Sequence, residues 1–279
     1  MTLFVADLRA FAAAVRRALR ENRRYPMLVL GSFFWPILLP AMYVLMGQVY
    51  SGGDPRALAA FAARSGTGEV AGFVFVGFAM YMWLSILLWG PGTALRQEQL
   101  RGSLEAVFLT PASRLVVLFG PPVASLWPVL LQFAIMAVGL SVLFGVQLEL
   151  GAMLRALVVI VVGIPAMYGL GAIFASGVLH LGEVGPAVQF VRGICVLACG
   201  ITYPIVMLPG WAQGVAATLP PTYIVDGMRR VLLAGAGLDE IAVQLGMTLG
   251  LAAVGIALAV VLYRWTERQA RVSGMLGRF

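Results

Sequence analysis

Residues 95–114, LRQEQLRGSLEAVFLTPASR, form a charged segment enclosed between two long apolar segments, residues 70–94 and 116–145. The charged segment carries three arginines and two glutamates in a chain that is only 11% charged. Such a stretch cannot lie in lipid, whereas the apolar segments that flank it are long enough to cross a bilayer. This alternation predicts a polytopic membrane protein of the all-α class, with residues 95–114 facing water.

The composition of the whole chain supports a membrane protein without a sizeable soluble domain. The 279 residues are 61% hydrophobic, whereas soluble domains are nearer half apolar. The net charge is +7, and all 19 basic residues are arginines that cluster beside apolar segments. Anionic lipid headgroups and the positive-inside bias explain these arginines better than binding to nucleic acid does.

Residues 1–25 are predicted to form an amphipathic helix that lies along the cytoplasmic membrane surface. One helical face of this segment is apolar, and its arginines project from another side. The segment is too long and too rich in arginine for a signal peptide, so we expect no cleavage. The apolar face consists of Phe4, Leu8, Phe11, Val15 and Leu19.

Six apolar segments reach the roughly 20 residues that a membrane-spanning helix needs. Thirteen arginines lie before the first segment, in the charged segment or after the last, against five on the opposite side. This asymmetry predicts that both termini, including the tail 264–279, and residues 95–114 are cytoplasmic. The six predicted spans are residues 26–50, 70–94, 116–145, 152–179, 187–208 and 241–263.

The segment 209–236 is apolar but interrupted by prolines and glycines, so its unbroken runs are too short to span. We expect one or two short re-entrant helices on the outer face, covered by protein where they dip into the membrane. The residues singled out in this segment are Pro209, Gly210, Trp211, Pro220, Asp226 and Arg229.

No residue pattern in the chain predicts a catalytic, metal or cofactor site. The absence of lysine excludes a Walker A motif, and the single histidine excludes a zinc site of the HExxH type. Cys195 and Cys199 lie in an apolar run and are predicted to be core residues. A lipid-modifying enzyme needs a nucleophile or paired carboxylates, which are not visible.

Charged residues are almost absent from the centres of the predicted spans, and Arg155 and Arg192 lie near predicted ends. An ion-coupled secondary transporter would need ionisable groups in mid-membrane and an inverted repeat. This transporter remains the alternative function, and the scarcity of charges at the span centres favours an energy source outside the chain.

If residues 95–114 are helical, Glu98, Arg101 or Gly102, and Glu105 share one face, and Thr110-Pro111 ends the helix. A short charged helix that projects from two spans is suited to a groove in a partner protein. The alternative is a solvated connector that is stabilised by its own charge pairs.

The same residues resemble the signature of ABC-2 type transporter permeases. The match comprises Glu98-x-x-Arg101-Gly102-Ser103-Leu104-Glu105 followed by Thr110-Pro111, although threonine is commoner than serine at position 103. Later motifs match in order, and the start of the first span is similar to that of permeases for daunorubicin or multidrug resistance. These later motifs include Leu208-Pro209-Gly210-Trp211, Leu219-Pro220-Pro221-Thr222-Tyr223, Asp226-Gly227, Arg229 and Arg268-x-x-Arg271-x-x-Gly274.

This resemblance implies the membrane subunit of a type V ABC exporter in a bacterial plasma membrane. Two permease subunits, identical or different, would pair above two separate ATPase subunits that hold ATP and Mg²⁺. Residues 1–25 would be the connecting helix and 95–114 the coupling helix that docks on the ATPase. The coupling residues would be Glu98, Arg101, Gly102, Glu105, Thr110 and Pro111.

Aromatic and methionine side chains of the first, second and fifth spans are candidates for the lining of an apolar or amphipathic substrate pathway. For each of them, helix packing or lipid contact is the competing interpretation. The candidates are Phe33, Phe34, Trp35, Met42, Tyr43, Phe78, Tyr81, Met82 and Tyr203.

Overall fold

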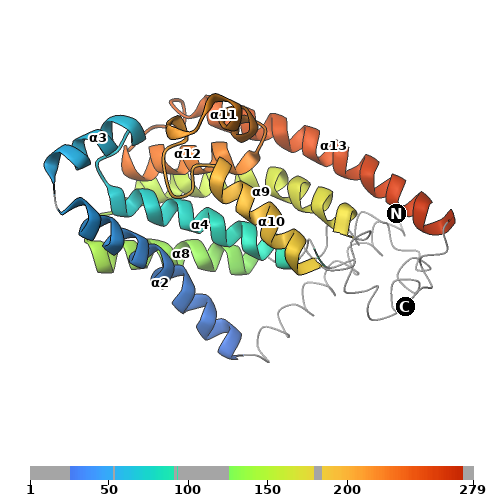
Figure 1. Ribbon diagram of the computed structural model, residues 1–279, viewed down its shortest axis with the longest axis horizontal. Helices are drawn as coiled ribbons and strands as arrows, with labels where there is room; N and C mark the ends of the chain where they lie inside the picture. Colours follow the sequence, from blue (N-terminus) through green and yellow to red (C-terminus); the bar gives the residue numbers. More distant parts are fainter. Residues whose placement is uncertain (1–25, 53, 91–92, 94–125, 179–183, 273–279) are drawn as a thin grey trace.

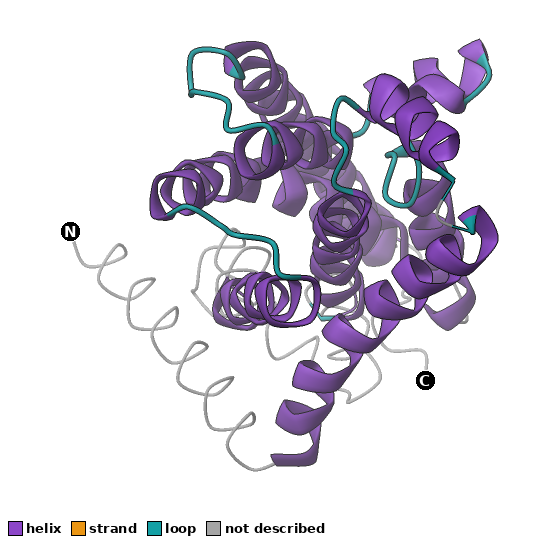
Figure 2. Ribbon diagram, turned by 90° about the vertical axis from the view of Figure 1, so that its left-hand side faces the viewer, coloured by secondary structure: helices purple, strands orange, loops and turns teal. Residues whose placement is uncertain are grey.

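The computed structural model describes residues 26–52, 54–90, 93, 126–178 and 184–272 (Figure 1). Within these ranges every regular element is a helix, and Figure 2 shows only helices joined by loops. The expected all-α class is therefore confirmed for the part of the chain that the structure describes. The helices are α2 (Pro26–Ser51), α3 (Pro55–Ser65), α4 (Val70–Trp89), α8 (Leu126–Phe144), α9 (Leu150–Val178), α10 (Val184–Ala198), η2 (Ile205–Met207), α11 (Gly210–Ala217), α12 (Pro220–Leu233) and α13 (Ala242–Val272).

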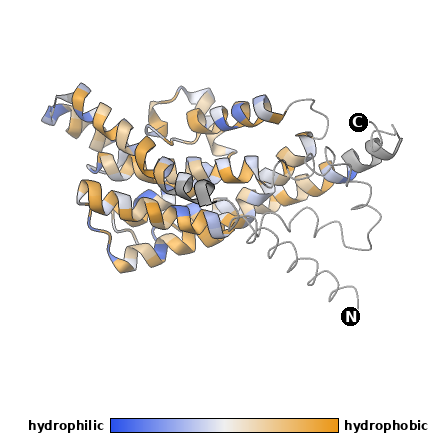
Figure 3. Cartoon of the chain, turned by 90° about the horizontal axis from the view of Figure 1, so that it is seen from below, coloured by the Kyte–Doolittle hydropathy of each residue, from blue (hydrophilic) through white to orange (hydrophobic). Residues whose placement is uncertain are grey.

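Four of the described helices are long and apolar enough to cross a membrane: α4, α8, α9 and residues 242–265 of α13. The first and fifth predicted spans contain shorter apolar helices, Phe34–Tyr50 and Val184–Ala198. Large apolar side chains are exposed along α2, α8, α9 and α13, and Figure 3 shows how apolar the helices are over most of their length. In water such surfaces would aggregate, so they are typical of helices in contact with lipid.

Helix α4 is the centre of the bundle. The most apolar 18 residues of α4 are 67% buried, whereas the corresponding residues of α13 are only 17% buried. It packs against α2, α8, α9, α10 and α12. A helix that is apolar all round is expected to be enclosed by other helices, and α4 follows this rule.

The buried side chains form two clusters on either side of α4. The larger cluster surrounds Trp83 and joins α4 to α9, α10 and α12. The smaller cluster joins α4 to α2 and α8, and in it the Phe75 ring packs edge-on against Phe144 at 5.4 Å. The structure therefore fixes α2 and α10 to α4, and α2 and α4 together carry eight of the nine candidate pathway residues.

Helices α9 and α13 make the most extensive contact in the described bundle, and glycines allow their backbones to approach each other. A Cβ atom added at Gly169 would lie 3.2 Å from the backbone carbon of Gly255. Small residues serve this purpose in membrane proteins, where close van der Waals packing replaces the hydrophobic effect between helices.

Three features differ from the sequence predictions: the ends of two helices and the presence of a third helix. Helix α10 ends at Ala198, whereas the fifth span was predicted to continue to residue 208. After α10 the chain turns at Gly200 and reaches the short helix η2 through Pro204, and neither residue favours helix continuation. Helix α13 continues to Val272, beyond the predicted end at 263.

The third difference is α3, which lies in the predicted connection between the first two spans. Its start is capped by the Asp54 carboxylate, which accepts a hydrogen bond from the backbone N–H of Arg56 at 2.9 Å, and Pro55 occupies the first helical position. Gly66 ends it in the left-handed conformation with φ 74°. Asp54-Pro55 at the start and Gly66 at the end are thus sequence signals for this helix, and hydropathy alone does not detect them.

We predict that Gly169→Leu will destabilise the fold by about 1–3 kcal/mol, because the side chain must separate α9 from α13. The measurement is the unfolding midpoint of the purified protein in an SDS titration, followed by circular dichroism. Gly250→Leu on α13 is the matched control, since an added Cβ there meets nothing within 4 Å. Equal midpoints for the two variants would contradict the assigned role of the close helix crossing.

Candidate functional site

Three of the candidate pathway residues form a continuous aromatic row across α2 and α4. The ring centroids of Tyr43 and Phe78 are 5.0 Å apart, and those of Phe78 and Tyr81 are 5.7 Å apart. Phe78 is buried, whereas Tyr43 is 46% exposed and Tyr81 is half-buried. The row therefore has a buried centre and two accessible ends.

A positive charge extends this row onto α10. The Arg192 guanidinium carbon lies 5.0 Å from the centroid of the Tyr81 ring. Its other polar contacts are to the Ser85 hydroxyl at 3.4 Å and to the Gln189 side-chain oxygen. The sequence analysis placed Arg192 near the start of the predicted span 187–208, and in the structure it is the ninth residue of the 15-residue helix α10.

The other pathway candidates lie apart from this row. Phe34 and Trp35 pack edge-on at 6.2 Å on the exposed face of α2, where Met42 is also exposed. Tyr203 donates a hydrogen bond to the Leu197 carbonyl at the end of α10. Met82 is half-buried on α4, and the Phe33 side chain lies outside the described residues.

A separate cavity of about 320 Å³ lies between α4, α8, α9 and α12. Its lining consists wholly of apolar residues, among them Phe75, Phe133, Met153 and Met228. None of the predicted pathway residues lines it, so it is distinct from the aromatic row.

Arg229 is a buried charge at the junction of α4, α12 and the turn that follows α10. Its guanidinium donates to the Phe73 carbonyl at 2.9 and 3.2 Å, to the Gly200 carbonyl at 2.7 Å and to the Ile201 carbonyl at 2.9 Å. The guanidinium also lies over the Phe73 ring, with 3.2 Å between its carbon and the ring centroid. A residue only 8% exposed can keep its charge because carbonyl dipoles and a ring face replace water.

Gly77 makes this arrangement possible. A Cβ atom at this position would overlap the Ile201 carbonyl, lying 2.7 Å from its carbon and 2.8 Å from the Arg229 Nη2 atom. Any larger residue at position 77 would push the turn away from α4, and the guanidinium would then lose acceptors.

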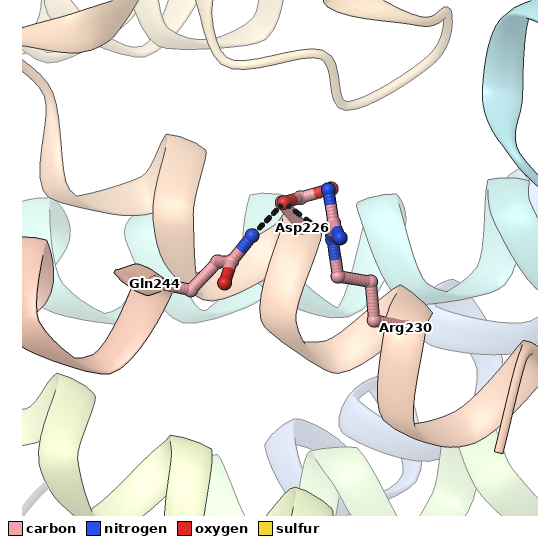
Figure 4. Close-up of polar contacts among 3 residues, drawn as sticks. All are labelled: Asp226, Arg230 and Gln244. Atoms are coloured by element: carbon pink, nitrogen blue, oxygen red, sulfur yellow. Dashed lines mark hydrogen bonds and ion pairs between the residues drawn. The ribbon is translucent and has the colours of Figure 1, made fainter. Parts of the chain in front are cut away.

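Asp226 does not pair with Arg229 but joins α12 to α13 (Figure 4). Its carboxylate accepts from Arg230 at 2.9 Å, one turn along α12, and from the Gln244 side-chain nitrogen at 2.8 Å. Both charges of the Asp226–Arg230 pair are about half exposed, so the pair contributes at most about 1 kcal/mol.

The remaining residues of the segment 209–236 begin its two helices. Pro209 precedes α11, which starts at Gly210, and Pro220 is the first residue of α12. Trp211 is 76% exposed on α11. Two short helices therefore occupy the segment, as the broken apolar pattern predicts, and α12 is the better enclosed of the two.

The sequence matches the model of one protein family, described as ABC-2 type transporter, over residues 9–233. The chain belongs to the ABC-2 type transporter family. It is a multi-pass membrane permease subunit, and permeases of this family work with ATPase subunits. A comparison with curated proteins gives no match.

The coupling residues of this ABC-2 permease cannot be placed by the structure. Glu98, Arg101, Gly102, Glu105, Thr110 and Pro111, together with the connecting segment 1–25, lie outside the described residues. Their roles remain predictions.

Three residues that position the site in this permease were missed by the sequence analysis: Arg192, Gly77 and Gln244. Arg192 had a visible signal, because it is the only charged residue in the predicted span 187–208. Gly77 and Gln244 had none, because their partners lie far along the chain.

We predict that Arg229→Gln will destabilise the permease by about 3 kcal/mol or more, since carbonyls on α4 and in the turn lose their donor. The neighbouring variant Arg230→Gln removes the same charge from an exposed side chain and is expected to cost about 1 kcal/mol at most. SDS-unfolding midpoints of the two purified proteins compare the effects. A loss no larger for Arg229→Gln than for Arg230→Gln would show that the carbonyl contacts contribute little.

Proposed function

We propose that this permease forms, with a second identical or different permease subunit, the pathway of an ABC exporter for hydrophobic or amphipathic substrates such as drugs, lipids or glycolipids. Membership of the ABC-2 family is the observation that carries the proposal. The family assignment favours this function over an ion-coupled transporter. The complex resides in a bacterial plasma membrane, with both termini of the permease in the cytoplasm.

Two separate ATPase subunits drive transport and hold the ATP and Mg²⁺. Their closure on ATP moves the coupling helix 95–114, which connects directly to the spans at 70–94 and 116–145. Glu98, Arg101 and Glu105 contact the ATPase, while residues 1–25 lie on the membrane beside it. The re-entrant segment 209–236 closes the outer side of the pathway.

The aromatic row supports the proposed pathway, because it crosses from α2 to α4 and ends at α10. Aromatic rings offer apolar area with little side-chain entropy to lose, which suits binding of substrates with varied shapes. Two further predictions separate the coupling segment from the pathway.

The double variant Glu98→Lys/Glu105→Lys is expected to lose ATPase binding while the permease remains in the membrane, since two charge contacts become repulsive. Affinity purification of the tagged permease from solubilised membranes measures the ATPase that remains bound. Glu69→Lys/Glu149→Lys is the matched control. It makes the same charge change directly before the first residues of α4 and α9, whereas the coupling segment follows the last residue of α4. Undiminished ATPase recovery with the first variant would refute the docking role.

Tyr43→Arg is expected to reduce export by about tenfold or more at normal ATPase recovery, because it places a charge at the accessible end of the aromatic row. Export is measured as ATP-dependent accumulation of a dye in inverted vesicles. Tyr50→Arg serves as the control, because the Tyr50 side chain near the end of α2 is 82% exposed. Unchanged export by Tyr43→Arg would remove Tyr43 from the pathway lining.

A further inference from the structure

Arg192 is a charge in the middle of the apolar helix α10, where it contacts two residues of α4. On α4 its neighbours Tyr81 and Ser85 lie eight and four residues before the end of the helix at Trp89. At 1.5 Å per residue, these positions are about 12 and 6 Å inside that end of α4. Charged residues at such depths are costly, and where they occur they usually contact a substrate, an ion or a charged partner.

The contacts of Arg192 leave its charge uncompensated within the part of the chain that the structure describes. A hydroxyl, an amide oxygen and a ring face are all neutral partners. The contrast with Arg229 is informative: Arg229 is buried and donates to three backbone carbonyls, whereas Arg192 is only half-buried beside the exposed Gln189. The guanidinium of Arg192 thus retains donors and an accessible side.

The aromatic row adjoins Arg192 on the side of Tyr81. Tyr81 touches the guanidinium, Phe78 lies beneath, and Tyr43 continues the row onto α2. A ligand that spans the row would place one end on a cation and the rest on aromatic rings. Charge complementarity then requires that this end is an anion, and the guanidinium fork matches a carboxylate or a phosphate.

We propose that Arg192 binds the anionic group of an amphipathic substrate, while Tyr81 and Tyr43 hold its apolar part and Phe78 supports both rings from below. This inference rests on the proposed function, because it assigns the substrate class of the same pathway. Under this proposal the preferred substrates are anionic amphiphiles, and the site does not select substrates by their apolar part alone.

The test uses the complete complex of the permease and its co-purified ATPase subunits in phosphatidylcholine nanodiscs. Three fluorescent probes share one chain and differ only in the head: dansyl-labelled undecanoate, the matching undecanol and the matching undecyl trimethylammonium. We expect the carboxylate to bind about tenfold more tightly than the alcohol, as a charge-assisted hydrogen bond in an apolar site requires. The cation is expected to bind most weakly.

The Arg192→Gln variant should bring the carboxylate and the alcohol to within about twofold of each other, and Arg192→Lys should keep part of the preference. Arg64→Gln on α3 removes the same charge from an exposed helix and should leave the preference unchanged. Tyr81→Leu should weaken the binding of all three probes. A preference that survives Arg192→Gln, or equal binding of the three probes to the unaltered complex, would overturn the proposal.

Transport of the same probes in phosphatidylcholine proteoliposomes distinguishes a substrate site from a site for a resident lipid. ATP-dependent movement must favour the carboxylate, and preferential binding without preferential transport would overturn the substrate assignment. ATPase recovery and basal ATP hydrolysis in each sample report on the proposed function separately. If they are normal while the headgroup preference is absent, only the role of Arg192 fails; if no ATPase accompanies the permease, the proposed function fails as well.

Discussion

The guanidinium of Arg229 imposes the constraint on which the packing of α12 against α4 and the turn after α10 depends. Taking a charge out of water costs several kcal/mol unless the protein supplies acceptors. Here the acceptors are carbonyls of Phe73 on α4 and of Gly200 and Ile201 after α10. Helix α12, which carries Arg229, is thereby held against both, and Gly77 is needed because a side chain would occupy the space of the turn.

This junction also lies next to the end of α10. Arg229 donates to the carbonyls of Gly200 and Ile201, two and three residues after α10 ends at Ala198. Because the helix ends there and begins at Val184, Arg192 falls in its middle and not at its edge.

Helix α4 takes part in both the Arg229 junction and the aromatic row. Phe73 and Gly77 lie in its first half and contact the Arg229 junction, while Phe78 and Tyr81 begin the aromatic row that leads to Arg192. Phe73 and Tyr81 are eight residues apart, which is about 12 Å along a helix. In the proposed exporter α4 leads directly to the coupling segment. A movement of that segment would therefore act on both the pathway and the Arg229 junction through the same helix.

The sequence by itself determined the all-helical class, the approximate places of the apolar helices and the two short helices of residues 209–236, because these follow from local hydropathy and from prolines that interrupt a helix. The motifs around Glu98–Pro111 and Pro209–Arg229 were sufficient to indicate the family. Only the tertiary structure decided that Tyr43, Phe78, Tyr81 and Arg192 form one row and that Arg229 bonds to carbonyls and not to Asp226. The physical reason is that these contacts join residues as much as 156 positions apart, whose proximity depends on how the helices pack and not on any local pattern.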